Sequence, residues 1–214
     1  FKFLAGNIIM EFKKLEHMLE LQDQVNSLIS NEWRANNNPW YRAIWLESAE
    51  LLEHFSWKWW SNKEDDIEQA QLELVDIWHF GLSALLQQHG DAKQVIKYLE
   101  NSSFTEISND INHRNIKIVI EEFVLSTLEH KSFNINIFLQ LCKLLSLEFN
   151  ELYKIYLGKN ILNNFRQKNG YKTGVYKKIW MGFEDNHYLF KIIKETDVDS
   201  LNFSEIVYEK LNFH

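Results

Sequence analysis

Four acidic residues stand in two short motifs whose spacing could bind a metal ion. Glu47-Ser-Ala-Glu50 and Glu73-Leu-Val-Asp76 each place two carboxylates three residues apart within mostly apolar sequence. Residues three apart on a helix lie about 60° apart around its axis, so each motif presents both carboxylates on one face. An unpaired buried carboxylate is costly, and four of them facing a core need a cation. Mg²⁺ and Mn²⁺ prefer oxygen ligands of this kind.

The helices that carry the two motifs are predicted to lie side by side. A helix over about 39–60 begins with Pro39, and a second over about 65–88 has apolar residues on every face, which predicts a central position. A short polar turn joins them, so antiparallel packing would bring the four carboxylates together. One Glu-x-x-Glu motif alone is typical of a solvated face. Two motifs about 26 residues apart, with no Lys or Arg between residues 67 and 90, favour a metal site.

The composition predicts an all-α protein. The 214 residues are 45% hydrophobic and include one proline and seven glycines, and no segment alternates strictly between apolar and polar residues. We expect a helical bundle with a four-helix metal-binding core, in a single catalytic domain over residues 10–214 that follows an extension over residues 1–9. The core helices are expected at about 11–30, 39–60, 65–88 and 135–169, with a further helix at about 116–130 and short amphipathic helices at the end.

Charge and cysteine content narrow the class of protein. The net charge of −7 argues against a nucleic-acid binder, because such proteins need a basic surface. The single cysteine, Cys142, cannot form an intrachain disulfide. The sequence shows no apolar run of 18 residues and no signal peptide. We therefore expect no membrane association and a cytoplasmic location.

Two amides interrupt the apolar face of the first predicted helix. Gln22 and Asn26 fall among leucine, methionine and isoleucine positions on the helical wheel. Buried amides must find hydrogen-bond partners. They form hydrogen bonds either with a neighbouring helix or water, or with a planar polar ligand such as a nucleobase.

A basic stretch near the C-terminus is a candidate phosphate site. Between Lys159 and Lys178 the sequence holds six Lys or Arg residues and no acid, although the chain has 30 acids. Gly170 and Gly174 give this stretch backbone freedom. The alternatives are a solvated basic face and a clamp over a phosphorylated substrate.

These features together resemble a known family. The two acidic motifs, the run Gly158-Lys-Asn-Ile-Leu-Asn-Asn-Phe-Arg-Gln-Lys-Asn-Gly-Tyr-Lys and the run Tyr176-Lys-Lys-x-Trp-x-Gly-x-Glu-Asp-Asn186 are similar to those of the dimeric dUTPases, members of the all-α nucleoside triphosphate pyrophosphohydrolase superfamily. MazG-like relatives share the acidic motifs, so the C-terminal runs carry the likeness to dUTPases. The likeness covers about residues 14–60, 66–87 and 155–187.

The resemblance implies a role for each matching residue. It assigns Mg²⁺ binding to Glu47, Glu50, Glu73 and Asp76. We expect these acids to hold two or three ions, with Mn²⁺ as a substitute, and Glu50, ahead of Glu47, to accept a proton from the attacking water while it stays at the metal. It implies nucleoside contacts for Gln22, Asn26 and Trp57. The implied contacts to the phosphates and the rest of the nucleotide, within a nucleotide-clamp segment over residues 158–187, are Lys159, Asn163, Arg166, Tyr171, Lys178 and Asn186.

The implied activity is hydrolysis of dUTP to dUMP and pyrophosphate by a metal-activated water in a homodimer. The resemblance extends to hydrolysis of dUDP to dUMP and phosphate. The alternatives are a MazG-like enzyme acting on another nucleotide such as dCTP, and a helical protein that binds a nucleotide without hydrolysing it. His79 follows Asp76 by three residues, as in ferritin-like di-iron bundles, but the companion motif is missing. His54 is expected to pack beside the metal ligands.

Overall fold

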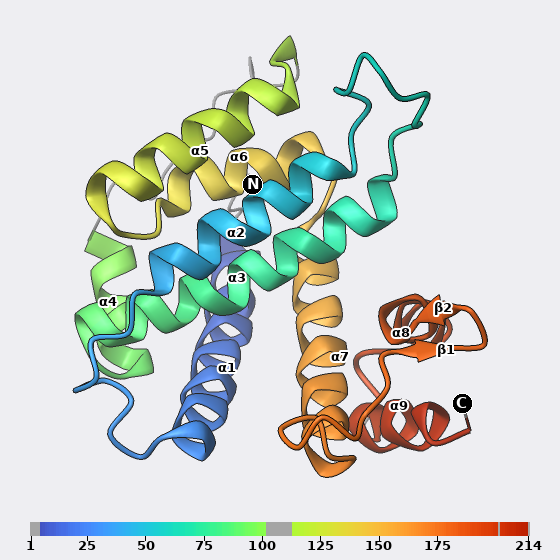
Figure 1. Ribbon diagram of the computed structural model, residues 1–214. Helices are drawn as coiled ribbons and strands as arrows, with labels where there is room; N and C mark the ends of the chain where they lie inside the picture. The colour runs from blue at the N-terminus through green and yellow to red at the C-terminus, as the bar shows by residue number, and fades with distance from the viewer. Residues whose placement is uncertain (1–4, 102–112, 201, 214) are drawn as a thin grey trace. The chain divides into compact units, whose positions relative to one another are not determined.

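The computed structural model describes the backbone of residues 5–101, 113–200 and 202–213, and the side chains of these ranges except residues 5–10 and 101 (Figure 1). The chain divides into two compact units, Phe1–Asn150 and Glu151–His214. Helices of the first unit are α1 (Ala5–Ile29), α2 (Trp40–Glu53), α3 (Ile67–His89), α4 (Ala92–Asn101), α5 (Ile116–His130) and α6 (Ile135–Leu144). The second holds nearly all of α7 (Phe149–Lys168), then β1 (Ile179–Trp180), β2 (Phe183–Glu184), α8 (Asp185–Lys194) and α9 (Phe203–Leu211).

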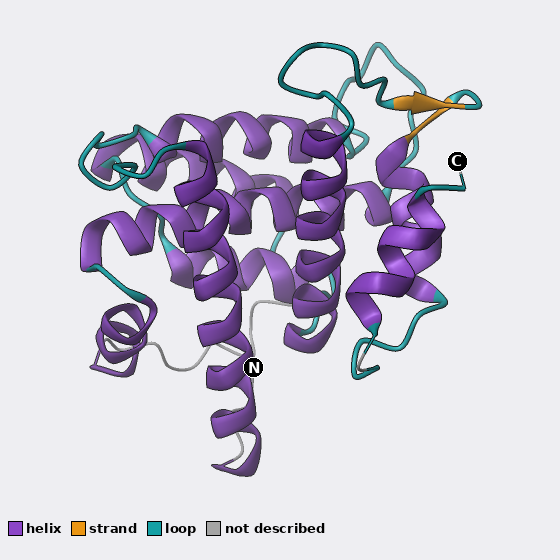
Figure 2. Cartoon of the chain, turned by 90° about the horizontal axis from the view of Figure 1, so that it is seen from below, coloured by secondary structure: helices purple, strands orange, loops and turns teal. Residues whose placement is uncertain are grey.

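The all-α prediction is confirmed. Among the described residues, strands occur only in the hairpin of β1 and β2, as Figure 2 shows. Met181 and Gly182 connect these strands with φ of 43° and 89°, the two positive values of a tight hairpin turn. No helix of the described residues is long and apolar enough to cross a membrane.

Helix α3 is the central helix of the first unit, as predicted. Asp66 begins it by accepting a hydrogen bond from Gln69 N at 3.1 Å, and Gly90 ends it with a φ of 109°. Trp78 is buried on α3, where its ring stacks on Phe138 with centroids 5.1 Å apart. A Cβ at Gly81 would lie 2.8 Å from the ring of Phe133, so α3 packs closely against its neighbour there.

Helices α2 and α3 are antiparallel (Figure 1). Trp40 Nε1, at the start of α2, donates to Gln87 Oε1, near the end of α3, at 3.0 Å. His54, just after α2, contacts Glu73, in the second turn of α3. The expected pairing of the two acidic helices is therefore present.

The prediction of a helix over 39–60 is wrong at its C-terminal end, because α2 stops at Glu53. The N–H of His54 bonds back to the last turn of the helix, and its carbonyl accepts from Asp66 N at 2.8 Å. Backbone groups that would continue the helix thus bond across the loop to α3 instead.

The prediction of one helix over 135–169 is also wrong, because a turn separates α6 from α7. Ser146 adopts a positive φ of 52°. Its N–H bonds to Lys143 O, and the next N–H, of Leu147, bonds to Cys142 O at 2.8 Å. These two bonds form a Schellman motif, which usually has glycine at the position of Ser146 and was therefore not visible in the sequence.

The structure does not test the predicted division of the chain into an extension and a single domain. Helix α1 begins at Ala5, and the separation of residues 1–9 as an extension stays a prediction, as does a single catalytic domain over 10–214. Residues 102–112 lie outside the described residues.

Candidate functional site

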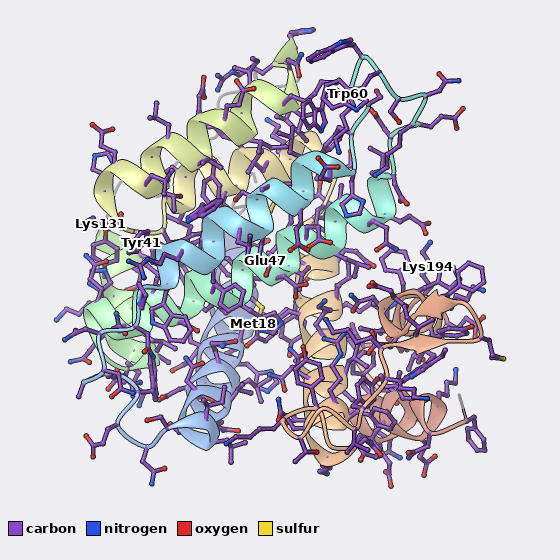
Figure 3. All side chains as sticks on the ribbon, in the orientation of Figure 1. Met18, Tyr41, Glu47, Trp60, Lys131 and Lys194 are labelled. Atoms are coloured by element: carbon purple, nitrogen blue, oxygen red, sulfur yellow. The ribbon has the colours of Figure 1, made fainter. Side chains whose placement is uncertain are left out.

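Three of the four predicted metal ligands lie together in the first unit. Glu47 on α2 and Glu73 and Asp76 on α3 each offer a carboxylate oxygen within 4.8 Å of the other two. All three side chains are half-buried. Figure 3 shows Glu47 at the side of α2 that faces α3. The antiparallel pairing of α2 and α3 places the first motif opposite the second, as the spacing predicted.

Glu50 lies outside this group of three. It is on α2, three residues after Glu47, and its side chain is exposed. Helical spacing predicts that both carboxylates face α3, but a difference of about 60° around the axis is enough to bring one of them to the helix edge. A metal-binding or catalytic role for Glu50 stays a prediction.

His54 contacts one of the three carboxylates directly. Its Nε2 lies 3.2 Å from Glu73 Oε1, and both side chains are largely buried. A histidine N–H that bonds to a carboxylate limits the rotation of that carboxylate. The expectation that His54 packs beside the metal ligands therefore agrees with its position.

Gln22 and Asn26 belong to a buried network of hydrogen bonds between α1 and α3. Only 5% and 3% of these two residues is exposed. Gln22 Nε2 donates to Asn26 Oδ1 at 3.2 Å, and both amide nitrogens donate to Ser83 Oγ at 3.0 Å. His79 Nδ1 lies 2.8 Å from Gln22 Oε1. The amides thus bond to a neighbouring helix, which was one of the two expected outcomes, and a base-reading role stays a prediction.

Sequence reasoning missed the α3 side of this network. The sequence-based predictions give Ser83 no role and treat His79 only as a candidate ligand of a di-iron site. The available signal was their spacing: residues four apart share a helix face, and both are polar in a helix of apolar residues. Buried polar side chains of this kind must be bonded to one another or to a partner helix.

Trp57 lies in the loop between α2 and α3. The residue is 36% exposed, and its ring meets the edge of Trp60 at a centroid distance of 5.7 Å. Figure 3 labels Trp60 in the same loop. Trp59 completes the aromatic group and is 87% exposed. The predicted nucleoside contact of Trp57 is not tested by this arrangement.

Within the second unit, two predicted phosphate contacts, Lys159 and Arg166, and one predicted contact to the rest of the nucleotide, Asn163, share one face of α7. Lys159, Asn163 and Arg166 follow one another by four and three residues, which places them along one side of the helix. Lys159 is 2% exposed and Arg166 is 8% exposed, so the basic stretch is not simply a solvated face. Lys159 Nζ donates to Asn186 Oδ1 at 3.1 Å.

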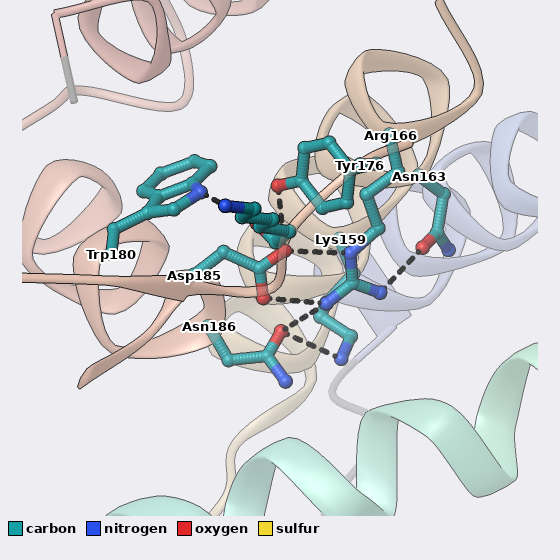
Figure 4. A network of polar contacts seen from close by, with 8 residues as sticks. Lys159, Asn163, Arg166, Tyr176, Trp180, Asp185 and Asn186 are labelled. Carbon is teal, nitrogen blue, oxygen red and sulfur yellow. Dashed lines mark hydrogen bonds and ion pairs between the residues drawn. The ribbon is translucent and has the colours of Figure 1, made fainter. Parts of the chain in front are cut away.

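Arg166 is bound by an acid that sequence reasoning did not single out (Figure 4). Its Nε and Nη2 donate to the two oxygens of Asp185 at 2.8 and 2.7 Å, and its Nη1 donates to Asn163 Oδ1 at 3.2 Å. The hydroxyl of Tyr176 donates to Asp185 Oδ2 at 2.8 Å. Asp185 lies within the run from Tyr176 to Asn186 that carries the family resemblance, but the sequence alone gives no sign that it pairs with Arg166.

The ion pair between Arg166 and Asp185 affects the pKa values of the acidic groups in this network. Burial acts to raise the pKa of Asp185, but the hydrogen bonds and charge of Arg166, with the Tyr176 hydroxyl, outweigh it and hold that pKa below its usual value. Burial and the Asp185 carboxylate raise the pKa of Tyr176. At neutral pH the network therefore holds an ionised Asp185 and a protonated Tyr176.

Of the other three predicted contacts, Asn186 is the second residue of α8 and is half-buried, and two lie in the loop and hairpin segment between α7 and α8. Tyr171 and Lys178 are both exposed, and Lys178 Nζ lies 5.7 Å from the centroid of the Tyr171 ring. The carbonyl of Lys178 accepts from Asp185 N at 2.8 Å, which ties the segment to the start of α8.

Comparison with known families identifies the chain. The sequence model described as dUTPase matches residues 14–171, a range that includes the carboxylate group, the amide network and α7. The chain belongs to the all-α dUTPase family. It is a dUTP diphosphatase, an enzyme that hydrolyses dUTP, and the resemblance drawn from the sequence is confirmed. No curated protein sequence matches it.

The dUTPase match does not reach every predicted residue. Lys178, Asn186 and Asp185 follow the matched range. The roles predicted for the first two depend on the run that begins at Tyr176, and they stay predictions.

The carboxylates of this dUTPase fit a divalent cation. All three converging ligand atoms are oxygens, which is the donor type that Mg²⁺ and Mn²⁺ prefer. Like charges this close raise each other's energy unless a cation or a proton intervenes. The substrate is itself an anion, so a divalent ion would also let the triphosphate approach these acids.

Proposed function

We propose that the chain hydrolyses dUTP to dUMP and pyrophosphate in a Mg²⁺-dependent reaction, with Glu47, Glu73 and Asp76 as metal ligands. The observation that supports the proposal is the convergence of their three carboxylate oxygens within 4.8 Å of one another in a member of the dUTPase family. Glu50 is proposed as the fourth ligand on the strength of the resemblance.

The metal ions, Glu50 and His54 would each contribute to the reaction in a different way. When bound, two or three divalent ions, with Mn²⁺ as a substitute, would neutralise charge on the phosphate oxygens and lower the pKa of a water molecule. Glu50 is proposed to accept the proton of the attacking water, ahead of Glu47, while it stays at the metal, because its side chain is exposed and lies at the edge of the group of three. His54 restrains the carboxylate of Glu73 through its 3.2 Å contact.

The nucleoside is proposed to contact Gln22, Asn26 and Trp57. The two amides carry both donors and acceptors, which suits the polar edge of uracil. Trp57 offers a partly exposed ring for stacking or edge contact.

The remaining predicted residues are proposed to contact the phosphates and the rest of the nucleotide. Asp185 fixes the orientation of the Arg166 guanidinium by bonding to Nε and Nη2, and the N–H groups that do not bond to Asp185 are proposed to contact phosphate oxygens. Lys178 is exposed and so can change its position on ligand binding. The full set is Lys159, Asn163, Arg166, Tyr171, Lys178 and Asn186.

Three further properties are proposed, the first two from the resemblance and the third from the sequence-based expectation. They are hydrolysis of dUDP to dUMP and phosphate, a homodimer and a cytoplasmic location. Phosphate release from dUDP tests the first, and the mass measured by light scattering after size exclusion tests the second.

The experiment that tests the proposed function measures pyrophosphate release from dUTP, dCTP, dTTP and UTP, with Mg²⁺ and with a chelator. Selective hydrolysis of dUTP that requires Mg²⁺ and is lost in Glu47→Gln is the expected result. Equal hydrolysis of all four substrates would favour a MazG-like activity, and binding without hydrolysis would favour a nucleotide-binding protein. Activity that survives the chelator would contradict the metal assignment.

A further inference from the structure

The hydroxyl of Ser83 on α3 bonds to both amides of the network, Gln22 and Asn26 on α1. Ser83 is fully buried, and its Oγ lies 3.0 Å from each of three partners. It donates to the carbonyl of His79, one turn earlier on α3. It accepts from Gln22 Nε2 and from Asn26 Nδ2.

These bonds decide which way both amides point. A serine hydroxyl has one hydrogen, and Ser83 gives it to the His79 carbonyl, so toward the amides its oxygen can only accept. Gln22 and Asn26 must therefore turn their NH₂ groups to Ser83. Turning an amide oxygen toward Ser83 would either place two acceptors 3.0 Å apart or draw the hydroxyl hydrogen away from the His79 carbonyl, and that single hydrogen could serve only one of the two amides.

The bonds among the remaining groups agree with this orientation. Gln22 Oε1 faces His79 Nδ1 at 2.8 Å, and Gln22 directs Nε2 to Asn26 Oδ1 at 3.2 Å. Rotating the amide of Asn26 by half a turn would set its NH₂ against that of Gln22 and its oxygen against Ser83. Two hydrogen bonds would be lost in a buried site, where unmet polar groups are costly.

The orientation of such an amide bears directly on the choice between two pyrimidines. Uracil carries a donor at N3 and an acceptor at O4, whereas cytosine carries an acceptor at N3 and a donor at N4. An amide free to rotate can satisfy either pattern, because rotation exchanges its donor and acceptor. An amide that is held in one orientation satisfies only one of them.

We propose that Ser83 is a positioning residue that makes the enzyme prefer uracil to cytosine, by holding the amides of Asn26 and Gln22 in one orientation. This inference rests on the proposed function, in which these two amides contact the base. Ser83 does not touch the substrate in this scheme, and it acts only through the amides.

The experiment measures kcat/KM for dUTP and for dCTP in the full chain and in Ser83 variants. Ser83→Ala should lower the dUTP to dCTP ratio by about tenfold, the order of one lost hydrogen bond. Ser83→Cys, which keeps the size but is a weak acceptor, should do the same, and it serves if Ser83→Ala does not fold. Ser83→Thr, which keeps the hydroxyl, should retain the ratio.

Ser48→Ala is the matched control. Ser48 is also fully buried on a helix, and its hydroxyl makes the equivalent bond to Ile44 O at 2.7 Å. Its removal should lower stability about as much as Ser83→Ala and should leave the ratio of the two substrates unchanged. A ratio that falls equally in Ser48→Ala would show a general structural effect and would overturn the proposal.

Asn26→Ala separates the role of Ser83 from the contact between the amides and the base. If Asn26→Ala lowers the ratio while folded Ser83→Ala or Ser83→Cys leaves it unchanged, the role of Ser83 is wrong and the base contact stands. If Asn26→Ala and Gln22→Ala both leave the ratio unchanged, the base contact itself is wrong, and the inference about Ser83 is overturned with it.

Discussion

Arg166 and Asp185 form an ion pair with one hydrogen bond to each carboxylate oxygen, from Nε at 2.8 Å and from Nη2 at 2.7 Å. The pair joins α7 to the first residue of α8 within the second unit (Figure 4). The side chain of Asp185 is fully buried, and that of Arg166 is 10% exposed. Since two bonds in a plane fix a guanidinium more firmly than one, Asp185 determines where the remaining N–H groups of Arg166 point.

Asp185→Asn should destabilise the protein by about 3 kcal/mol, because it leaves a largely buried guanidinium without its counter-charge. Tyr176→Phe removes only a neutral donor from the same carboxylate and should cost about 1 kcal/mol. Urea unfolding followed by circular dichroism compares the two variants with the wild type. Equal losses in both would show that the charge of Asp185 contributes little.

The stability that Asp185 contributes should disappear in acid. The pKa of this carboxyl is lowered in the folded protein, so the folded state binds its proton less readily than the unfolded chain, where the pKa is about 3.9. The contribution is complete above the unfolded pKa and is lost as the pH falls through the folded pKa. The difference in unfolding free energy between wild type and Asp185→Asn should therefore be constant from about pH 7 to pH 5 and shrink below about pH 4. A difference that is unchanged at pH 3 would contradict this.

Arg166→Ala should weaken the binding of a non-hydrolysable dUTP analogue by at least about tenfold while leaving deoxyuridine binding nearly unchanged, because the guanidinium charge and the N–H groups that do not bond to Asp185 are proposed to contact phosphates. The single variant leaves Asp185 buried and unpaired, so Arg166→Ala combined with Asp185→Asn is the better comparison. Isothermal titration calorimetry measures both ligands. A similar loss for both ligands would place Arg166 away from the phosphates.

The parts of the fold that depend on composition and spacing were predictable from the sequence. Helix α3 shows why: its residues are apolar on every face, and Asp66 and Gly90 mark its two ends chemically. The same spacing rule located Glu47 opposite Glu73 and Asp76, once α2 and α3 were expected to be antiparallel.

The errors came from residues whose conformation depends on distant or unusual contacts. The turn at Ser146 uses a positive φ without glycine, so nothing in the local sequence indicated it. Helix α2 stops where a carbonyl bonds across a loop to Asp66. Asp185 pairs with an arginine 19 residues earlier, and such pairing depends on how the chain folds back rather than on spacing along one helix.

Glu47→Gln and Glu50→Gln should have different effects, because only Glu47 lies in the group of three carboxylates. Glu47→Gln should weaken Mn²⁺ binding by at least about tenfold and abolish turnover, since one charged ligand is lost. Glu50→Gln should abolish turnover with a smaller loss of Mn²⁺ affinity, as expected for a residue whose main task is to accept a proton.

Glu53→Gln is the matched control for both variants, because Glu53 lies on α2 three residues after Glu50 and pairs with Lys58. It should change neither Mn²⁺ affinity nor turnover. Calorimetric titration with Mn²⁺ and the pyrophosphate assay provide the two measurements. An active Glu50→Gln variant would remove Glu50 from the site.

His54→Ala should lower Mn²⁺ affinity by about tenfold without removing a metal ligand, because Glu73 would lose the contact that restrains its carboxylate. His54→Gln should recover most of this loss, since a glutamine side chain can donate an N–H to the same oxygen. His130→Ala, at an exposed histidine that bonds to Ser126 O at the end of α5, controls for loss of an imidazole elsewhere. If His54→Gln behaves like His54→Ala while both remain folded, the packing of the ring matters more than its hydrogen bond.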